Sequence, residues 1–186
     1  MKAKTIKNKE DINKIKQYLI NKNSFNFDRH LLYFTLGINT CLKPDDLISL
    51  KWKDLINDNG IVKDYLFFNG YRFYLNRNCK YIIYWYIKSY KYVLDNEIVF
   101  NMTYHATNKL YRQIAKELNL NIEFSNLTLH KTFVYWQLYY EHRDYIKMSK
   151  LRLLIKEGEK NRIRDINTYS EYYIDDDMIY INNVNL

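Results

Sequence analysis

The sequence predicts an α+β domain that is mainly α-helical and carries one small antiparallel β-hairpin. Its 186 residues include only 4 glycines and 1 proline, and 47% are hydrophobic, a composition typical of a folded, helix-rich body with few tight turns. Most segments place apolar residues three and four positions apart, which is the spacing of an amphipathic helix. The strongest hairpin signal is Asn69-Gly70, because both central residues of a type I′ turn need a positive φ angle.

Helices are expected at three places before this turn: residues 9–21, residues 29–38, and a segment that begins at Pro44. Proline fits the first turn of a helix, and the acidic residues Asp45 and Asp46 that follow it complement the helix dipole there. This third helix is expected to hold Leu47 and Leu50 on one apolar face.

The hairpin strands are expected on either side of the turn, at residues 61–68 and 71–75. Further helices are expected at four places: residues 80–94, 107–118, 128–140 and 144–155. Residues 98–100 read as a short edge strand, and the charged run 156–165 reads as a solvated loop. Because no internal repeat or linker-like stretch divides the chain, we expect a single domain over residues 1–186.

The charge balance favours a polyanionic partner. The chain has 29 lysines and arginines against 21 acidic residues, which gives a net charge of +8 and a pI near 9.2. Nucleic acid is the commonest polyanion that such proteins bind, so the charge favours a nucleic-acid partner, and the alternative is a basic protein that binds no polyanion.

Cysteine and histidine usage gives no support to a metal site or a cofactor. Cys41 and Cys79 lack the CxxC spacing, and the four histidines form no HExxH or similar ligand cluster. The two cysteines are therefore expected to be reduced thiols of a cytoplasmic protein. The N-terminus lacks the apolar core of a signal peptide, and no run reaches the roughly 18 apolar residues that span a bilayer.

A resemblance to a known family begins in residues 37–54, GINTCLKPDDLISLKWKD. This stretch is similar to the first signature box of the tyrosine recombinases (phage integrases), which runs roughly Gly-Leu-Arg-x-x-Glu-Leu-x-x-Leu-x-Trp-x-Asp. Six positions fall at the matching spacing: Leu42, Asp46, Leu47, Leu50, Trp52 and Asp54.

The order of later elements is also similar to that family. After the hairpin, residues 127–133 (LTLHKTF) resemble its box His-x-x-Arg-Lys-Thr-Phe, and Tyr173-Ile174 lies where the family has its terminal tyrosine. The resemblance covers nearly all of the chain and is to the catalytic domain alone, without the N-terminal core-binding domain. It implies a tyrosine-recombinase catalytic-domain-like fold with a small antiparallel β-sheet.

The resemblance also implies a set of altered catalytic positions. In the family, a tyrosine attacks the scissile phosphate while two arginines, a hairpin lysine and histidines stabilise charge and move protons. Lys43 stands at the first arginine position, His130 at the second, and Leu127 where the box has its histidine. Tyr173 is the expected nucleophile, with the neighbouring Tyr172 as the alternative. A lysine lacks the planar two-pronged donor of arginine, and leucine cannot carry a proton.

Together with the positive charge, the resemblance implies double-stranded DNA as the partner. The expected contacts to it are basic side chains spread along the chain: Lys43, Arg72, Lys131, Arg162 and Arg164. Arg72 is the cation nearest to the hairpin turn, where the family has its lysine.

Three functions follow from a matched scaffold with mismatched catalytic residues. The first is a DNA-binding, catalytically degenerate relative with an accessory or regulatory role on a mobile element, acting through self-association or a partner recombinase. The second is a divergent, active recombinase or nicking-joining enzyme that forms a 3′-phosphotyrosyl DNA intermediate. The third is a protein-interaction module that no longer binds DNA.

Overall fold

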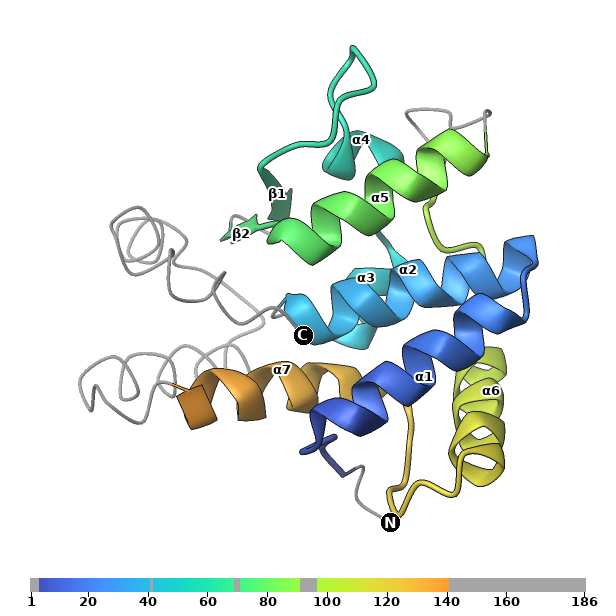
Figure 1. The fold of residues 1–186 in the computed structure, drawn as a ribbon. Coiled ribbons are helices and arrows are strands. Elements are labelled where there is room, and N and C mark those ends of the chain that lie inside the picture. The colour runs from blue at the N-terminus through green and yellow to red at the C-terminus, as the bar shows by residue number, and fades with distance from the viewer. Residues whose placement is uncertain (1–3, 41, 69–70, 91–96, 141–186) are drawn as a thin grey trace.

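The structure, a computed structural model, describes residues 4–40, 42–68, 71–90 and 97–140, and these form a mainly helical body (Figure 1). Its elements in chain order are α1 (Lys9–Asn21), α2 (Phe25–Asn39), α3 (Pro44–Ile48), α4 (Trp52–Leu55), β1 (Tyr65–Phe68), β2 (Tyr71–Tyr74), α5 (Arg77–Ser89), α6 (Tyr104–Glu117) and α7 (Asn126–Tyr140). The predicted helical character is confirmed.

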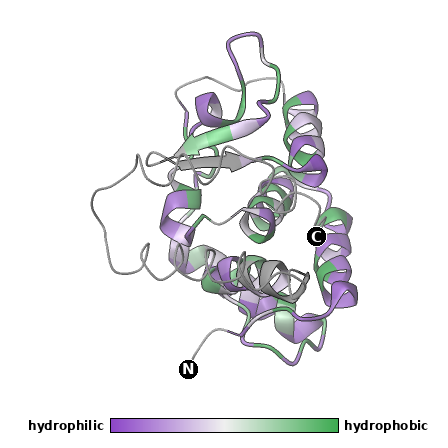
Figure 2. Ribbon diagram, turned by 90° about the vertical axis from the view of Figure 1, so that its left-hand side faces the viewer, coloured by the Kyte–Doolittle hydropathy of each residue, from purple (hydrophilic) through white to green (hydrophobic). Residues whose placement is uncertain are grey.

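Helix α2 is the central element of the body. Every residue from Leu31 to Asn39 is buried, which is the pattern of a helix surrounded by others. Helices α1, α5 and α7 all pack against it (Figure 1). Hydrophilic and hydrophobic residues alternate along the surrounding helices, as amphipathic helices require (Figure 2).

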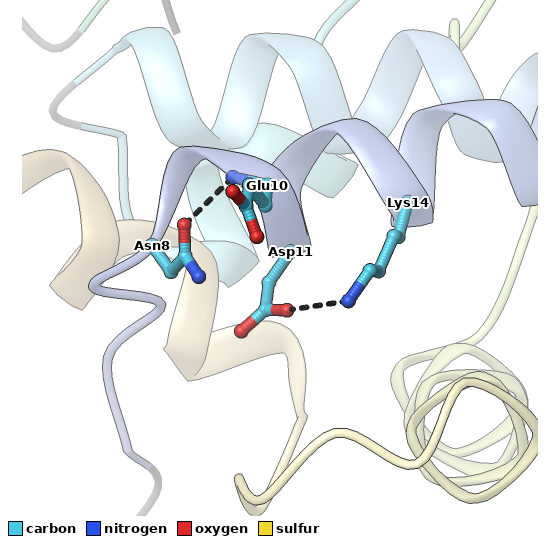
Figure 3. A network of polar contacts seen from close by, with 4 residues as sticks. All are labelled: Asn8, Glu10, Asp11 and Lys14. Carbon is cyan, nitrogen blue, oxygen red and sulfur yellow. Dashed lines mark hydrogen bonds and ion pairs between the residues drawn. The ribbon is translucent and has the colours of Figure 1, made fainter.

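Helix α1 has the bounds that its sequence predicts. Ile12, Ile15 and Leu19 are buried at helical spacing. The side chain of Asn8 caps the helix by accepting a hydrogen bond of 2.8 Å from the backbone N–H of Glu10 (Figure 3). Local signals are sufficient here, because the cap and the apolar stripe both lie within the segment.

The hairpin is a two-stranded antiparallel pair. Tyr65 faces Tyr74 and Phe68 faces Tyr71 in its register, and the turn at residues 69–70 lies outside the described residues. Leu66 is buried. The pairing begins at Tyr65, four residues later than predicted, because Val62 instead makes a single bridge to Ile56.

Helix α7 begins two residues earlier than predicted, and three other helices begin three or four residues earlier. The residues that precede them take extended backbone and serve as N-caps: Ser24 for α2, Asn76 for α5 and Thr103 for α6. Asn76 and Thr103 accept backbone N–H groups with their side chains, at 3.0 Å and 3.2 Å. Side-chain capping marks the starts of α5 and α6, whereas the Ser24 side chain makes no such bond at the start of α2.

The remaining corrections concern short elements. Helix α3 starts at Pro44 as predicted, but it ends at Ile48, so Leu50 lies outside it. Leu50 is still buried, and its carbonyl accepts a bond from Val99 N–H. The predicted strand at residues 98–100 is reduced to one bridge between Ile98 and Lys51. Helix α5 ends at Ser89 rather than residue 94, and the helix predicted at 144–155 lies outside the described residues.

None of the helices in the described part of the chain has both the length and the apolar character needed to cross a bilayer.

Candidate functional site

A surface pocket of about 360 Å³ lies where the starts of three helices meet. Its lining residues come from the start of α3 (Lys43, Pro44, Asp45), the start of α6 (Tyr104) and the first turns of α7 (Leu127, His130). Three positions singled out in the sequence, Lys43, Leu127 and His130, therefore line one cavity although they belong to distant segments.

Helices α2, α3 and α7 approach closely enough to form this pocket because Gly37 has no side chain. A Cβ atom at Gly37 would stand 2.6 Å from Leu129 Cδ1 and 3.2 Å from Leu47 Cδ2. Leu129 lies on α7 between the pocket residues Leu127 and His130, and Leu47 lies on α3. The contact at Gly37 thus sets how near α7 and α3 can come to α2.

The residues that match the first signature box form the scaffold of the pocket and do not line it. Leu42, Leu47, Leu50 and Trp52 are all buried in the core. The two acidic positions act at helix starts, where their carboxylates accept backbone N–H groups.

Asp46 accepts from the backbone N–H of Lys43, and Asp54 accepts from that of Lys51 at 2.8 Å. Each acid stands three residues after its donor, which is the geometry of half a capping box. Partial burial raises the pKa of Asp46, although the bond from Lys43 opposes the shift. Asp46 consequently fixes the backbone of Lys43 at the pocket.

The second segment that resembles the family, residues 127–133, also places some side chains in the core and others in the lining of the pocket. Thr132 is buried, and its hydroxyl donates to the carbonyl of Thr128 at 2.7 Å and accepts the backbone N–H of Ile6 at 3.1 Å. Leu127 and His130 lie three positions apart, so they share the face of α7 that reaches the pocket.

The polar groups of the pocket have different exposures. His130 is only 8% exposed, whereas Lys43 and Asp45 are exposed and Tyr104 is 42% exposed. Lys43 can attract one phosphate as a point charge, but Asp45 on the same pocket wall weakens the positive potential. Leu127 is 38% exposed and adds an apolar surface that can neither donate nor accept a proton.

Three residues near the pocket were missed by sequence reasoning: Asp45 and Tyr104 in its lining, and Tyr33 beside it. The Tyr33 hydroxyl is fully buried and has no hydrogen-bond partner among the described residues. Burial raises its pKa, and the nearby Tyr104 and Asp45 raise it further, which places Tyr33 within electrostatic reach of two lining residues. Thr103 as an N-cap was the sequence signal that could have assigned Tyr104 to a helix start.

The other predicted site residues are not brought to this pocket. Lys131 is half-buried on α7 and does not line it. Arg72 lies on β2, where its backbone faces Phe67. The predicted nucleophiles Tyr173 and Tyr172, and the predicted DNA contacts Arg162 and Arg164, lie outside the described residues.

The described residues contain no group of three or more histidine, cysteine or acidic side chains that could hold a metal ion. Cys79 is a buried free thiol, and burial raises its pKa to about 12. Cys41 lies outside the described residues. Trp136 on α7 is buried.

Comparisons with protein-family models, with curated proteins and with solved structures found no match to this chain.

Proposed function

We propose that this chain is a DNA-binding protein with the scaffold of a tyrosine-recombinase catalytic domain and a site that no longer cleaves DNA. The observation that carries the proposal is the convergence of Lys43, Leu127 and His130 on one pocket. The sequence resemblance had matched these positions to the arginine, histidine and arginine that surround the scissile phosphate in that family.

The chemistry of the pocket supports binding over cleavage. Phosphoryl transfer depends on positioned donors that neutralise the charge developing on the equatorial phosphate oxygens. Lys43 offers a single point charge, His130 is almost enclosed, and Leu127 offers no donor. Because removal of one such donor typically lowers turnover about 10²- to 10³-fold, the combined changes leave no useful strand cleavage.

The net charge of +8 supports a DNA partner, since Lys and Arg release counterions when they contact phosphates. A DNA-binding protein without strand cleavage suits an accessory or regulatory role on a mobile element, beside a partner recombinase or a second copy of the chain.

Duplex binding is tested by fluorescence anisotropy with a labelled DNA duplex over a series of salt concentrations. We expect log K to fall linearly with log salt, with a slope of about −0.9 for each phosphate contacted. Lys43→Gln is expected to weaken binding and to reduce the slope by about 1. Lys116→Gln on α6 is the matched control, because Lys116 is exposed and does not line the pocket.

Cleavage is tested with a nicked suicide substrate, which traps a covalent protein–DNA product. We expect no covalent product from the full chain. A product that disappears in Tyr173→Phe or Tyr172→Phe would replace this proposal with that of an active recombinase. Absence of binding to any duplex at low salt would replace it with that of a protein-interaction module.

A further inference from the structure

The outward face of α5 carries two exposed tyrosines between two cations. Arg77, Tyr81, Tyr84 and Lys88 follow one another at spacings of four, three and four residues. At 100° per residue these side chains fall on one stripe of the helix. The stripe lies opposite the buried face of α5, whose members are Cys79, Ile82, Ile83 and Tyr86.

We call these four residues, Arg77, Tyr81, Tyr84 and Lys88, the α5 stripe. Its two tyrosines are unusually exposed. Tyr81 is 68% exposed and Tyr84 is 56% exposed. Large aromatic side chains normally bury most of their area, so two neighbouring exposed rings on one helix face point to a binding surface. Helix α5 packs on α2 (Figure 1), and in the part of the chain that the structure describes its buried residues lie on the side opposite the α5 stripe.

The charge of the α5 stripe selects the class of partner. Helix α5 contains one arginine and two lysines and no acidic residue. Lys80 lies beside the stripe, and its Nζ atom forms an ion pair with Asp64 Oδ1 at 2.5 Å. The positive charges of the stripe itself are therefore those of Arg77 and Lys88. The Nζ atom of Lys88 stands 5.5 Å from the centre of the Tyr84 ring, which places a cation next to a stacking face.

We propose that the α5 stripe binds single-stranded nucleic acid by stacking bases on Tyr81 and Tyr84 while Arg77 and Lys88 contact the phosphates. Aromatic rings stack with any base, and flanking cations follow the backbone, which is the combination used by proteins that bind single strands. The stripe extends about 16 Å along the helix, a length that suits a few nucleotides. A duplex keeps its bases stacked inside, so it cannot use the exposed rings.

This inference is independent of the proposed function, because it rests on different residues and a different form of nucleic acid. Duplex binding through the pocket depends on Lys43, whereas single-strand binding depends on Tyr81 and Tyr84. Failure of either one therefore leaves the other unchanged.

The test uses the full chain and a fluorescein-labelled oligothymidine of about 12 nucleotides in an anisotropy titration. The variant Tyr81→Phe/Tyr84→Phe keeps both rings and is expected to bind within about two-fold of the parent protein. The variant Tyr81→Leu/Tyr84→Leu keeps apolar area but loses the rings, and it is expected to bind at least about ten-fold more weakly.

The charges are tested by the salt dependence of the same titration. Arg77→Gln/Lys88→Gln is expected to reduce the slope of log K against log salt by about 1.4, because each phosphate contact on a single strand contributes about 0.7. The control Arg112→Gln/Lys116→Gln removes the same two residue types from an exposed face of α6 and is expected to leave the slope unchanged.

Three results would overturn the proposal. The parent protein could fail to bind the single strand at low salt, the leucine pair could bind as well as the phenylalanine pair, or an unlabelled duplex of equal length could compete as well as the unlabelled single strand. Thermal unfolding by circular dichroism accompanies each variant, and the single changes Tyr81→Leu and Tyr84→Leu replace the pair if it unfolds early.

Discussion

Substitution of Gly37 by alanine tests whether the close approach of α2, α3 and α7 shapes this protein. The added Cβ would lie 2.6 Å from Leu129 Cδ1, 3.0 Å from Leu129 Cβ and 3.2 Å from Leu47 Cδ2. Both leucines are about 1% exposed and lie in a close-packed core, so neither can move away freely.

The expected magnitude follows from two opposed contributions. Overpacking of a well-filled core typically costs about 1–3 kcal/mol, whereas alanine in a helix interior is about 1 kcal/mol better than glycine. The approach of 2.6 Å places the overpacking cost in the upper part of its range, at about 2–3 kcal/mol, so the net loss expected for Gly37→Ala is about 1–2 kcal/mol. For a chain of this size, a loss of that order lowers Tm by about 2–8 °C.

Urea unfolding and thermal unfolding followed by circular dichroism measure this loss. A double-mutant cycle with Leu129→Ala locates its origin, because that change removes the Cδ1 atom that the new Cβ would meet. The cost of Gly37→Ala is expected to fall by at least about 0.5 kcal/mol in the Leu129→Ala background. An unchanged or higher stability for Gly37→Ala, together with no coupling to Leu129, would refute the close packing that forms the pocket.

Three further predictions use hydrogen bonds and titration, each measured by urea unfolding. Trp136→Phe removes the indole donor that bonds the Ile6 carbonyl at 3.0 Å and leaves that buried carbonyl unpaired, so it is expected to cost about 1–3 kcal/mol; no loss would show that the contact contributes nothing. Asn76→Ala removes a buried cap and a second buried hydrogen bond, and it is expected to cost more than Asn8→Ala, which removes an exposed cap alone; the reverse order would contradict this account. Burial, helped by a neighbouring arginine, lowers the pKa of His30 from 6.5 to about 4, so the unfolded chain binds the proton first and stability falls as pH decreases from about 6.5 to about 4. His30→Phe is expected to lose less stability over that interval, and an equal loss would contradict the assignment.

The sequence predicted those parts of the fold whose causes are local. The bounds of α1 follow from the spacing of Ile12, Ile15 and Leu19 and from the Asn8 cap, all within one segment. The start of α3 at Pro44 was equally local, because proline and the following acids suit a first helical turn.

Where a non-local partner mattered, the prediction from sequence was incomplete. Leu50 looked like the next residue of a helical stripe, yet its buried position depends on residues 97–100, which run alongside it and end the helix early. With Asn76 as its N-cap, helix α5 begins earlier than the spacing of its apolar residues predicts. The Asn76 side chain also donates a hydrogen bond to Asn39 at the end of α2, a contact between segments that are far apart in the sequence.

For the candidate site too, the sequence predicted individual residues, and the tertiary structure decided which of them meet. The sequence singled out Lys43, Leu127 and His130 by their places in two spaced motifs, but periodicity describes one segment at a time and cannot bring two segments together. Their meeting in one pocket was decided by helix packing, because Gly37 lets α7 and α3 approach α2 closely. The same packing added Tyr104 and Asp45 to the pocket lining, which the motifs did not predict.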